Sequence, residues 1–249
     1  MKKIFFLLFF IPLISFSQTI FADFKVINDE NEYLELEKLW KPYHLKMIAD
    51  GKMQAWFLFK VKSLNVEMEK PPTHVTINVF KDADQLKSYT ENWNETEFRT
   101  IVRSQFKNSY INKILGKNPV AENRRYLLEY IDQTIQAGGL LKVGDMITIG
   151  AMIQKSEDYE SVETQIYKPY VESQILKGNH RWWGLTKIKE SSENALKQFT
   201  HFTWNIPIEG KSFDAYFLQN QFISNKMAEI VTNSRDMPIT GSMELIDRN

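Results

Sequence analysis

The sequence contains an internal repeat, and this feature limits its possible folds more than any other. Residues 41–78 align with residues 168–205 at a constant offset of 127 and without a gap. Fourteen of these 38 positions are identical, whereas average composition would give about two identities by chance. In the first copy they are Lys41, Pro42, Tyr43, Ile48, Gly51, Trp56, Leu58, Lys60, Lys62, Lys70, Thr73, His74, Thr76 and Asn78. A period of this length corresponds to a domain-sized unit, so we expect a tandem duplication.

The first residues have the layout of a secretory signal peptide. Lys2 and Lys3 precede an apolar run over residues 4–14, and Ser15 and Ser17 provide small side chains before Gln18. The run is too short to span a bilayer, which needs about 20 residues. We therefore expect cleavage after residue 17 and a periplasmic or secreted protein without membrane attachment. With a seam at Gly138–Gly139, the predicted units are residues 1–17 (signal peptide), 18–138 and 139–249.

Composition excludes several classes of partner and chemistry. Without Lys2 and Lys3, 29 of the 31 basic side chains remain against 31 acidic ones, a formal charge of −2. No broad basic surface for nucleic acid is expected from this balance. The chain has no cysteine, which excludes disulfides, thiolate metal sites and cysteine nucleophiles. Its 13% aromatic content favours a substantial core or an aromatic-lined pocket.

Hydrophobic periodicity gives each copy the same order of elements. Opening strands are expected at 21–27 and 146–153, and an amphipathic helix at 30–50 that ends at Gly51. The second copy repeats the helix up to Gly178. Pro42 and Pro169 should kink these helices; the alternative is two short helices, with the proline in the first turn of the second.

The remaining elements complete the unit. Strands are expected at 53–61, 74–80, 180–188 and 201–206, helices at 84–92 and 212–225, and a helical insertion at 95–117. Residues 124–135 fit either a helix or a strand, and their likeness to 243–247 favours a closing strand. The order strand, helix, strand, strand, helix, strand, present twice, predicts an α+β fold of two tandem ferredoxin-like repeats. Their antiparallel sheets would pack face to face as an intrachain barrel-like pseudo-dimer.

The repeated residues also carry a resemblance to a known family. Trp40-Lys41-Pro42-Tyr43-His44, Gly51-Lys52 and Trp56, seen again as Tyr167-Lys168-Pro169-Tyr170, Gly178 and Trp183, resemble the dimeric α/β-barrel superfamily of antibiotic-biosynthesis-type monooxygenases and NIPSNAP-like proteins. The resemblance covers most of the chain and implies the same barrel. That superfamily includes cofactor-free oxygenases, haem-dependent enzymes and isomerases. No catalytic motif matches residue by residue, so no catalytic residue is assigned.

Strand alternation provides the candidate site. In the strand at 74–80, Val75, Ile77 and Val79 are expected under the helices, and the alternate side chains are expected to face the opposite sheet. We therefore predict a ligand site between the sheets. Its candidate residues are His74, Thr76, Asn78, His201, Thr203, Asn205, Trp56 and Trp183. The alternative is structural: these polar side chains would bond one another, and their identity would reflect common descent.

These expectations leave several functions open. The leading hypothesis is an exported module that binds a small, largely apolar molecule; the alternatives are a monooxygenase- or isomerase-type enzyme and a protein-interaction module that uses residues 95–117. No cofactor is predicted, although haem stays possible, and two repeated histidines are too few for a metal site. His44 is expected to be a surface histidine. The duplication is compatible with a monomer or a homodimer.

Overall fold

The computed structural model describes residues 18–213 and 221–249. The expected signal peptide (1–17) and the middle of the helix expected at 212–225 lie outside the described residues. The first half contains β1 (Thr19–Ile27), α1 (Glu30–Ala49), β2 (Ala55–Leu64), β3 (His74–Phe80), α2 (Ala83–Glu91), α3 (Glu95–Val102), α4 (Asn108–Leu115) and β4 (Val120–Gln133). The ambiguous segment 124–135 is therefore a strand over most of its length, and the insertion is helical, as predicted.

The second half has the same order of strands. It contains β5 (Met146–Gln154), α5 (Tyr159–Val162), the π-helix η1 (Glu163–Tyr167), α6 (Lys168–Leu176), β6 (His180–Ser191), β7 (His201–Pro207), α7 (Gln221–Ser234) and β8 (Arg235–Arg248). Among the helices that the structure describes, none has the length and apolar character needed to cross a membrane.

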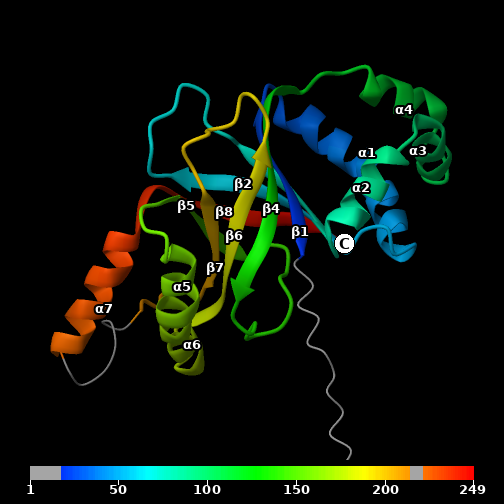
Figure 1. Ribbon diagram of the computed structural model, residues 1–249. Coiled ribbons are helices and arrows are strands. Elements are labelled where there is room, and N and C mark those ends of the chain that lie inside the picture. The colour runs from blue at the N-terminus through cyan, green and yellow to red at the C-terminus, as the bar shows by residue number, and fades with distance from the viewer. Residues whose placement is uncertain (1–17, 214–220) are drawn as a thin grey trace, which may run out of the picture.

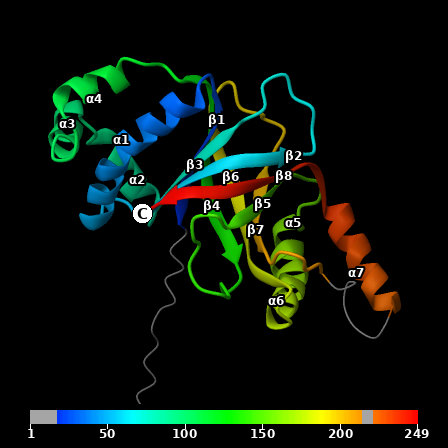
Figure 2. The ribbon, with the colours of Figure 1, turned by 180° about the vertical axis from the view of Figure 1, so that it is seen from behind.

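The eight strands form one closed barrel in the order β1-β3-β2-β8-β5-β7-β6-β4. Within it, β4-β1-β3-β2 and β8-β5-β7-β6 are equivalent four-stranded ferredoxin-like sheets, which confirms the predicted fold class. Antiparallel pairing of β2 with β8 and of β4 with β6 joins the two sheets at both edges. Figures 1 and 2 show α1–α4 gathered on one side of the barrel and α5–α7 on the other. Closure leaves no edge strand of either sheet unpaired.

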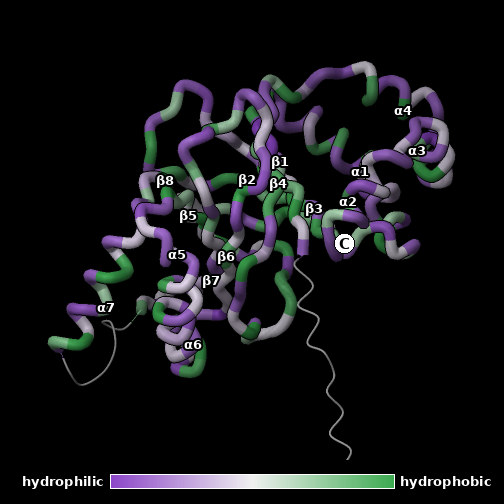
Figure 3. Tube along the Cα trace, in the orientation of Figure 1, coloured by the Kyte–Doolittle hydropathy of each residue, from purple (hydrophilic) through white to green (hydrophobic). Residues whose placement is uncertain are grey.

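Three apolar clusters hold the layers together. The barrel interior contains side chains such as Phe59, Val75, Ile77, Phe202 and Trp204. A second cluster lies between α1–α4 and the outer face of the first sheet, and a third lies under α5, η1 and α6. Figure 3 shows hydrophilic and hydrophobic stretches interleaved along strands and helices alike, as expected when each element has two differently covered faces.

The expected assignment of strand faces is wrong. Val75 and Ile77 point into the barrel, whereas Trp56 and Leu58 on β2 lie in the helix-covered cluster together with Tyr33 and Leu39 of α1. An eight-stranded barrel is just wide enough for side chains to fill it, so its interior takes the more apolar face of each strand. The polar face lies under the helices, where helix side chains can pair with it.

The two proline-containing helices differ between the halves. Helix α1 begins at Glu30 after Asp29, whose side chain accepts a hydrogen bond from the Glu32 N–H, and it continues through Pro42. In the second half Pro169 lies in the first turn of α6, directly after the π-helix. Tyr33 and Lys41 are eight residues apart, but their counterparts Tyr159 and Lys168 are nine apart. The wider π turn accommodates this extra residue.

Candidate functional site

The eight residues predicted to share one site lie in two places. Trp56, His74, Thr76 and Asn78 are under the first set of helices, and Trp183, His201, Thr203 and Asn205 are under the second. Since both sets are on the outer face of the barrel, they do not converge between the sheets. The structure therefore corrects the location that strand alternation predicted, and it separates two sites that are equivalent by duplication.

The strand register explains which side chains meet in the first half. Three rows of outward-facing residues cross β2, β3, β1 and β4 in that order. They are Trp56–Asn78–Phe21–Leu127, Leu58–Thr76–Asp23–Arg125 and Lys60–His74–Lys25–Asn123. The rows place two amides, one carboxylate and three cations on the face of the sheet that α1 covers.

A cavity of about 530 Å³ lies between these rows and the helices of the first half. Asp23, Lys25 and Arg125 line its floor together with Thr76 and Asn78. Its walls are largely aromatic and include Phe21, Tyr33, Trp40, Trp56, Phe80 and Tyr89. Ligand sites of proteins are typically apolar cavities of this size range with a few polar groups. We call this space the helix-side cavity.

Several buried polar atoms around the helix-side cavity lack a hydrogen-bond partner among the residues that the structure describes. They are Asp23 Oδ1, His44 Nδ1, Trp56 Nε1, Asn78 Oδ1 and Asn123 Oδ1, which we call the open polar atoms. Buried polar groups are nearly always hydrogen-bonded, and exceptions need an explanation. Asn205, the counterpart of Asn78, differs because it is hydrogen-bonded to His180. The open polar atoms therefore belong to side chains that line the cavity and have no partner within the described residues.

His44 is buried rather than on the surface, so that prediction is wrong. Its ring stacks on Trp56 at 5.2 Å between centroids, with 15° between the planes, and lies 6.0 Å from Trp40. Burial lowers the pKa of His44 to about 4, so the imidazole is neutral near pH 7. The repeat has Val171 at the equivalent position, and an apolar counterpart is a sequence signal for a buried site.

Two of the ion pairs that border the cavity lie on β1 (Lys25–Glu37 and Asp23–Arg125). Lys25 Nζ lies 2.9 Å from Glu37 Oε1 and 3.2 Å from the Tyr33 hydroxyl. Burial opposes ionisation of Glu37, but the Lys25 ammonium and its hydrogen bond outweigh burial, so the pKa of the Glu37 carboxyl is lowered. Arg125 Nε lies 3.2 Å from Asp23 Oδ1, and the Arg125 side chain is 58% exposed. This second pair lacks hydrogen-bond geometry.

The two repeated histidines are held by similar neighbours. His201 Nε2 lies 3.2 Å from Glu160 Oε1, which also accepts a hydrogen bond from Lys187 at 2.6 Å. In the first half His74 Nε2 lies 3.8 Å from Glu30 Oε1, and Glu30 pairs with Lys60. Tyr33 and Tyr159 pack edge-on against these imidazoles. Burial lowers the pKa of both histidines, to about 4 for His74, which agrees with the structural alternative for this pair.

Comparison of the halves separates inherited residues from specialised ones. The residues that β2 and β3 contribute to the three rows are identical to their counterparts on β6 and β7. The residues that β1 and β4 contribute differ from their counterparts on β5 and β8. Asp23, Lys25, Arg125 and His44 correspond to Gly150, Met152, Thr240 and Val171. The polar groups that the second half lacks are those gathered around the helix-side cavity.

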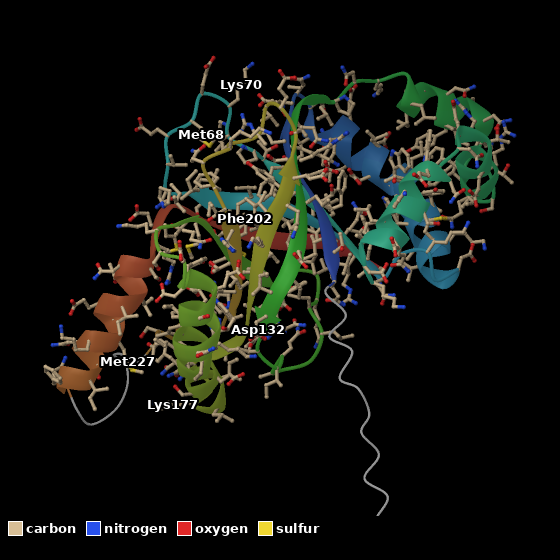
Figure 4. The ribbon with its side chains drawn as sticks, in the orientation of Figure 1. Met68, Lys70, Asp132, Lys177, Phe202 and Met227 are labelled. Carbon is tan, nitrogen blue, oxygen red and sulfur yellow. The ribbon has the colours of Figure 1, made fainter. Side chains whose placement is uncertain are left out.

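The barrel interior offers much less space. A cavity of about 60 Å³ at one end is lined by apolar side chains, including Phe24, Met68, Phe199 and Phe202. Figure 4 shows Phe202 among the strands and Met68 on the loop between β2 and β3. The region between the sheets is therefore mostly filled, and the predicted polar residues do not line it.

The residues of the helix-side cavity meet one of the two requirements for binding haem, an axial ligand, but not the other, free cations for its carboxylates. A haem iron needs an axial side chain such as histidine, and His44 Nδ1 is an open polar atom. Carboxylate groups of haem would favour unpaired cations, but Lys25 and Arg125 already face Glu37 and Asp23. Within residues 18–213 and 221–249, no group of three histidine or acidic side chains is placed to hold a metal ion.

Comparisons with known proteins agree with the fold. No protein-family model and no curated protein sequence matches the chain. An anthrone oxidase-like protein has a similar structure, with a TM-score of 0.52 and 10% identity over 95% of this chain and 94% of that chain.

Monooxygenase candidates are similar as well. Those from Fusobacterium nucleatum subsp. nucleatum ATCC 25586 and Lactobacillus acidophilus NCFM give TM-scores of 0.52 and 0.54, with 11% and 9% identity. The alignments cover 95% and 93% of this chain and 95% of each of those chains. The chain has the dimeric α/β-barrel fold that the sequence resemblance implied.

Proposed function

We propose that the protein binds a small, largely aromatic molecule in the helix-side cavity of its first half. The observation that carries this proposal is that the open polar atoms all belong to side chains that line one cavity of about 530 Å³. Leaving a buried polar group unpaired costs about 1–3 kcal/mol, so a ligand that bonds these atoms gains affinity. The proposal replaces a site between the sheets with one under α1.

Aromatic rings around the cavity support a flat ligand. Trp40, Tyr33, Phe21 and Tyr89 line it, and the stacked rings of His44 and Trp56 form part of its wall. Offset or edge-to-face ring contacts add about 0.5–1.5 kcal/mol beyond the burial of apolar area. The anthrone oxidase-like neighbour suggests the same class of molecule for this fold.

Binding fits His44 better than acid–base catalysis does. A general base works best when its pKa is close to the operating pH, whereas burial lowers the pKa of His44 to about 4. A neutral imidazole of this kind can accept a hydrogen bond or donate one, but it is a weak base. An enzyme of the monooxygenase or isomerase type is therefore the second candidate, favoured only by the monooxygenase candidates with this fold.

The helical insertion gives less support to an interaction module. Phe98 and Val102 of α3 and Ile111 and Ile114 of α4 are buried in the cluster that contains α1. The apolar faces of α3 and α4 therefore pack against α1. They are not exposed for contact with a partner protein.

Two matched tryptophan variants test the proposal. Trp56 and Trp183 are both fully buried at equivalent positions, and the indole N–H of each has no partner in the described part of the chain. We expect Trp56→Phe to weaken binding of anthrone, a flat aromatic ketone, about three- to tenfold, as loss of one hydrogen bond predicts. Trp183→Phe should leave it unchanged.

Isothermal titration calorimetry measures both affinities, and native mass spectrometry of the unmodified protein would reveal a retained ligand or haem. Equal effects of the two substitutions, or no binding of anthrone or any co-purified molecule, would contradict the proposal.

We also propose that binding takes place outside the cytoplasm. Support comes from the charged start, the short apolar run and the small residues before Gln18. Mass spectrometry of the protein from its own cells should find a chain that begins at Gln18. A chain that retains Met1 or Lys2 would argue against export.

A further inference from the structure

We infer that the ligand of the helix-side cavity is an aromatic amine, bound with its ammonium group at Asp23. This inference rests on the proposed function of the same cavity and adds the chemical class of its ligand. It also rests on the unpartnered Asp23 Oδ1 and on Gly150 at the equivalent position of the second half.

Apart from Asp23 and the largely exposed Arg125, each charged group that lines the cavity has a hydrogen-bonded partner of opposite charge. Lys25 donates to Glu37 and to the Tyr33 hydroxyl, and both side chains of the Lys25–Glu37 pair are buried. Glu122 accepts a hydrogen bond of 2.8 Å from Arg124 Nε, with both side chains largely buried. A charged ligand would have to break these contacts before it could use either carboxylate or the Lys25 ammonium.

Asp23 differs from the other two carboxylates. Its side chain is 12% exposed, and its Oδ1 is an open polar atom. The nearby Arg125 guanidinium is mostly in solvent and meets that oxygen without hydrogen-bond geometry. Because this contact has no hydrogen bond and the Arg125 side chain is 58% exposed, Arg125 can turn into the solvent when a ligand cation approaches Asp23.

Neighbouring atoms suit an ammonium group. Asp23 lies next to Thr76 on β3, and Asn78 and Asn123 lie in the adjoining rows, each with an open oxygen. An ammonium carries three N–H donors, and a charge-assisted bond to a carboxylate is about twice as strong as a neutral one. The surrounding indole and phenol rings can receive the ligand's ring, and their faces also attract a cation.

The second half cannot hold such a group. Gly150 occupies the position of Asp23, and a Cβ there would lie 2.7 Å from Met237 Sδ and 2.9 Å from Thr203 Oγ1. Any side chain at this position would require its neighbours to move. The carboxylate therefore belongs to the first half alone, together with the cavity it faces.

Three probes with one ring system test the inference: tryptamine, 3-methylindole and indole-3-propionate, which are cationic, neutral and anionic near pH 7. Calorimetry on the full-length protein should show tryptamine binding at least tenfold more tightly than 3-methylindole, with indole-3-propionate weakest. Asp23→Asn should reduce the preference for tryptamine over 3-methylindole to less than threefold. Asp23→Glu, which keeps the charge, should retain most of the preference.

The outcomes separate the two proposals. If 3-methylindole and tryptamine bind equally well, or indole-3-propionate binds best through Arg125, the inference is wrong although the cavity binds ligands. If tryptamine is still preferred in Asp23→Asn, the ammonium lies elsewhere and the inference fails. If none of the three indoles and no anthrone binds, the proposed function itself fails. Circular dichroism of each variant establishes that it is folded.

Discussion

His44 illustrates how one buried side chain links the cavity to stability. Its ring lies against Trp56, and burial lowers its pKa to about 4, whereas an unfolded histidine has a pKa near 6.5. Between these values the unfolded chain takes up a proton and the folded protein does not. The stability contributed by neutral His44 is therefore complete above about pH 6.5 and is lost as the pH falls towards 4.

A valine variant measures this contribution. The native protein should lose stability between pH 6.5 and 4, since burial also lowers the pKa of His74, His180 and His201. We expect His44→Val, which introduces the residue found at Val171, to reduce that loss by up to about 3 kcal/mol. Urea unfolding at both pH values tests it; an unchanged pH dependence would show that His44 is not buried as a neutral group.

At the residue scale the sequence identified a few side chains of the cavity lining but not their location. The repeat identified Trp56, Thr76 and Asn78, which do line the cavity. It could not identify Asp23 or His44, because residues specific to one copy do not appear among the identities. Their importance follows from strand register and helix packing, which bring together segments about 20 or more residues apart in the sequence.

At the scale of elements, the π-helix η1 is the site of the one-residue insertion between the two copies. Tyr33 packs on His74, and Tyr159, which precedes η1, packs on His201 in the same way. The helix before η1 therefore has the same orientation on its sheet as the start of α1. The extra residue is thus absorbed within one turn, and the contacts of the helix with the sheet are retained.

Deletion of Gln165, an exposed residue of η1, tests this explanation. We expect a continuous α-helix and a loss in unfolding free energy below about 1 kcal/mol, because the deletion restores the spacing of the first half. Deletion of exposed Lys38 from α1 is the control. It should rotate Tyr33 and Glu37 by about 100° relative to Leu39 and cost more than about 3 kcal/mol. Similar losses for both deletions in urea unfolding would refute the explanation.

The elements themselves were largely predictable, but their covered faces were not. Alternation placed β3 and β7 correctly and divided each strand into two sets of side chains. It could not determine which set faces the helices, since both sets are mostly buried: Val75 is 0% exposed and His74 is 1% exposed. Only closure of the barrel, which fills its interior with apolar side chains, settles the assignment.

For the whole molecule, closure makes the two halves dependent on each other. The β2–β8 and β4–β6 pairings cross between the halves, and the interior cluster draws residues from both. A separate half would expose two edge strands and its share of that cluster. The boundary at Gly138–Gly139 remains a prediction, although both glycines have positive φ angles of 75° and 78°, as suits a turn.

Separate expression of residues 18–138 and 139–249 tests this dependence. We expect each fragment alone to be aggregated or poorly folded, and the mixture to form a 1:1 complex with the mass of one barrel. Size-exclusion chromatography with light scattering provides the masses. A fragment that is monomeric and unfolds cooperatively on its own would show that the halves are independent domains.

The central claim is that ligands bind under α1 and not between the sheets, and the indole N–H signals of the six tryptophans can test it directly. Trp56 and Trp40 line the helix-side cavity, whereas Trp204 lies inside the barrel, where its Nε1 donates to Thr186. In a 15N–1H spectrum, a bound aromatic amine should shift the Trp56 and Trp40 signals and leave those of Trp204 and Trp183 unchanged. A shift of Trp204 without a shift of Trp56 would place the ligand between the sheets and contradict the account.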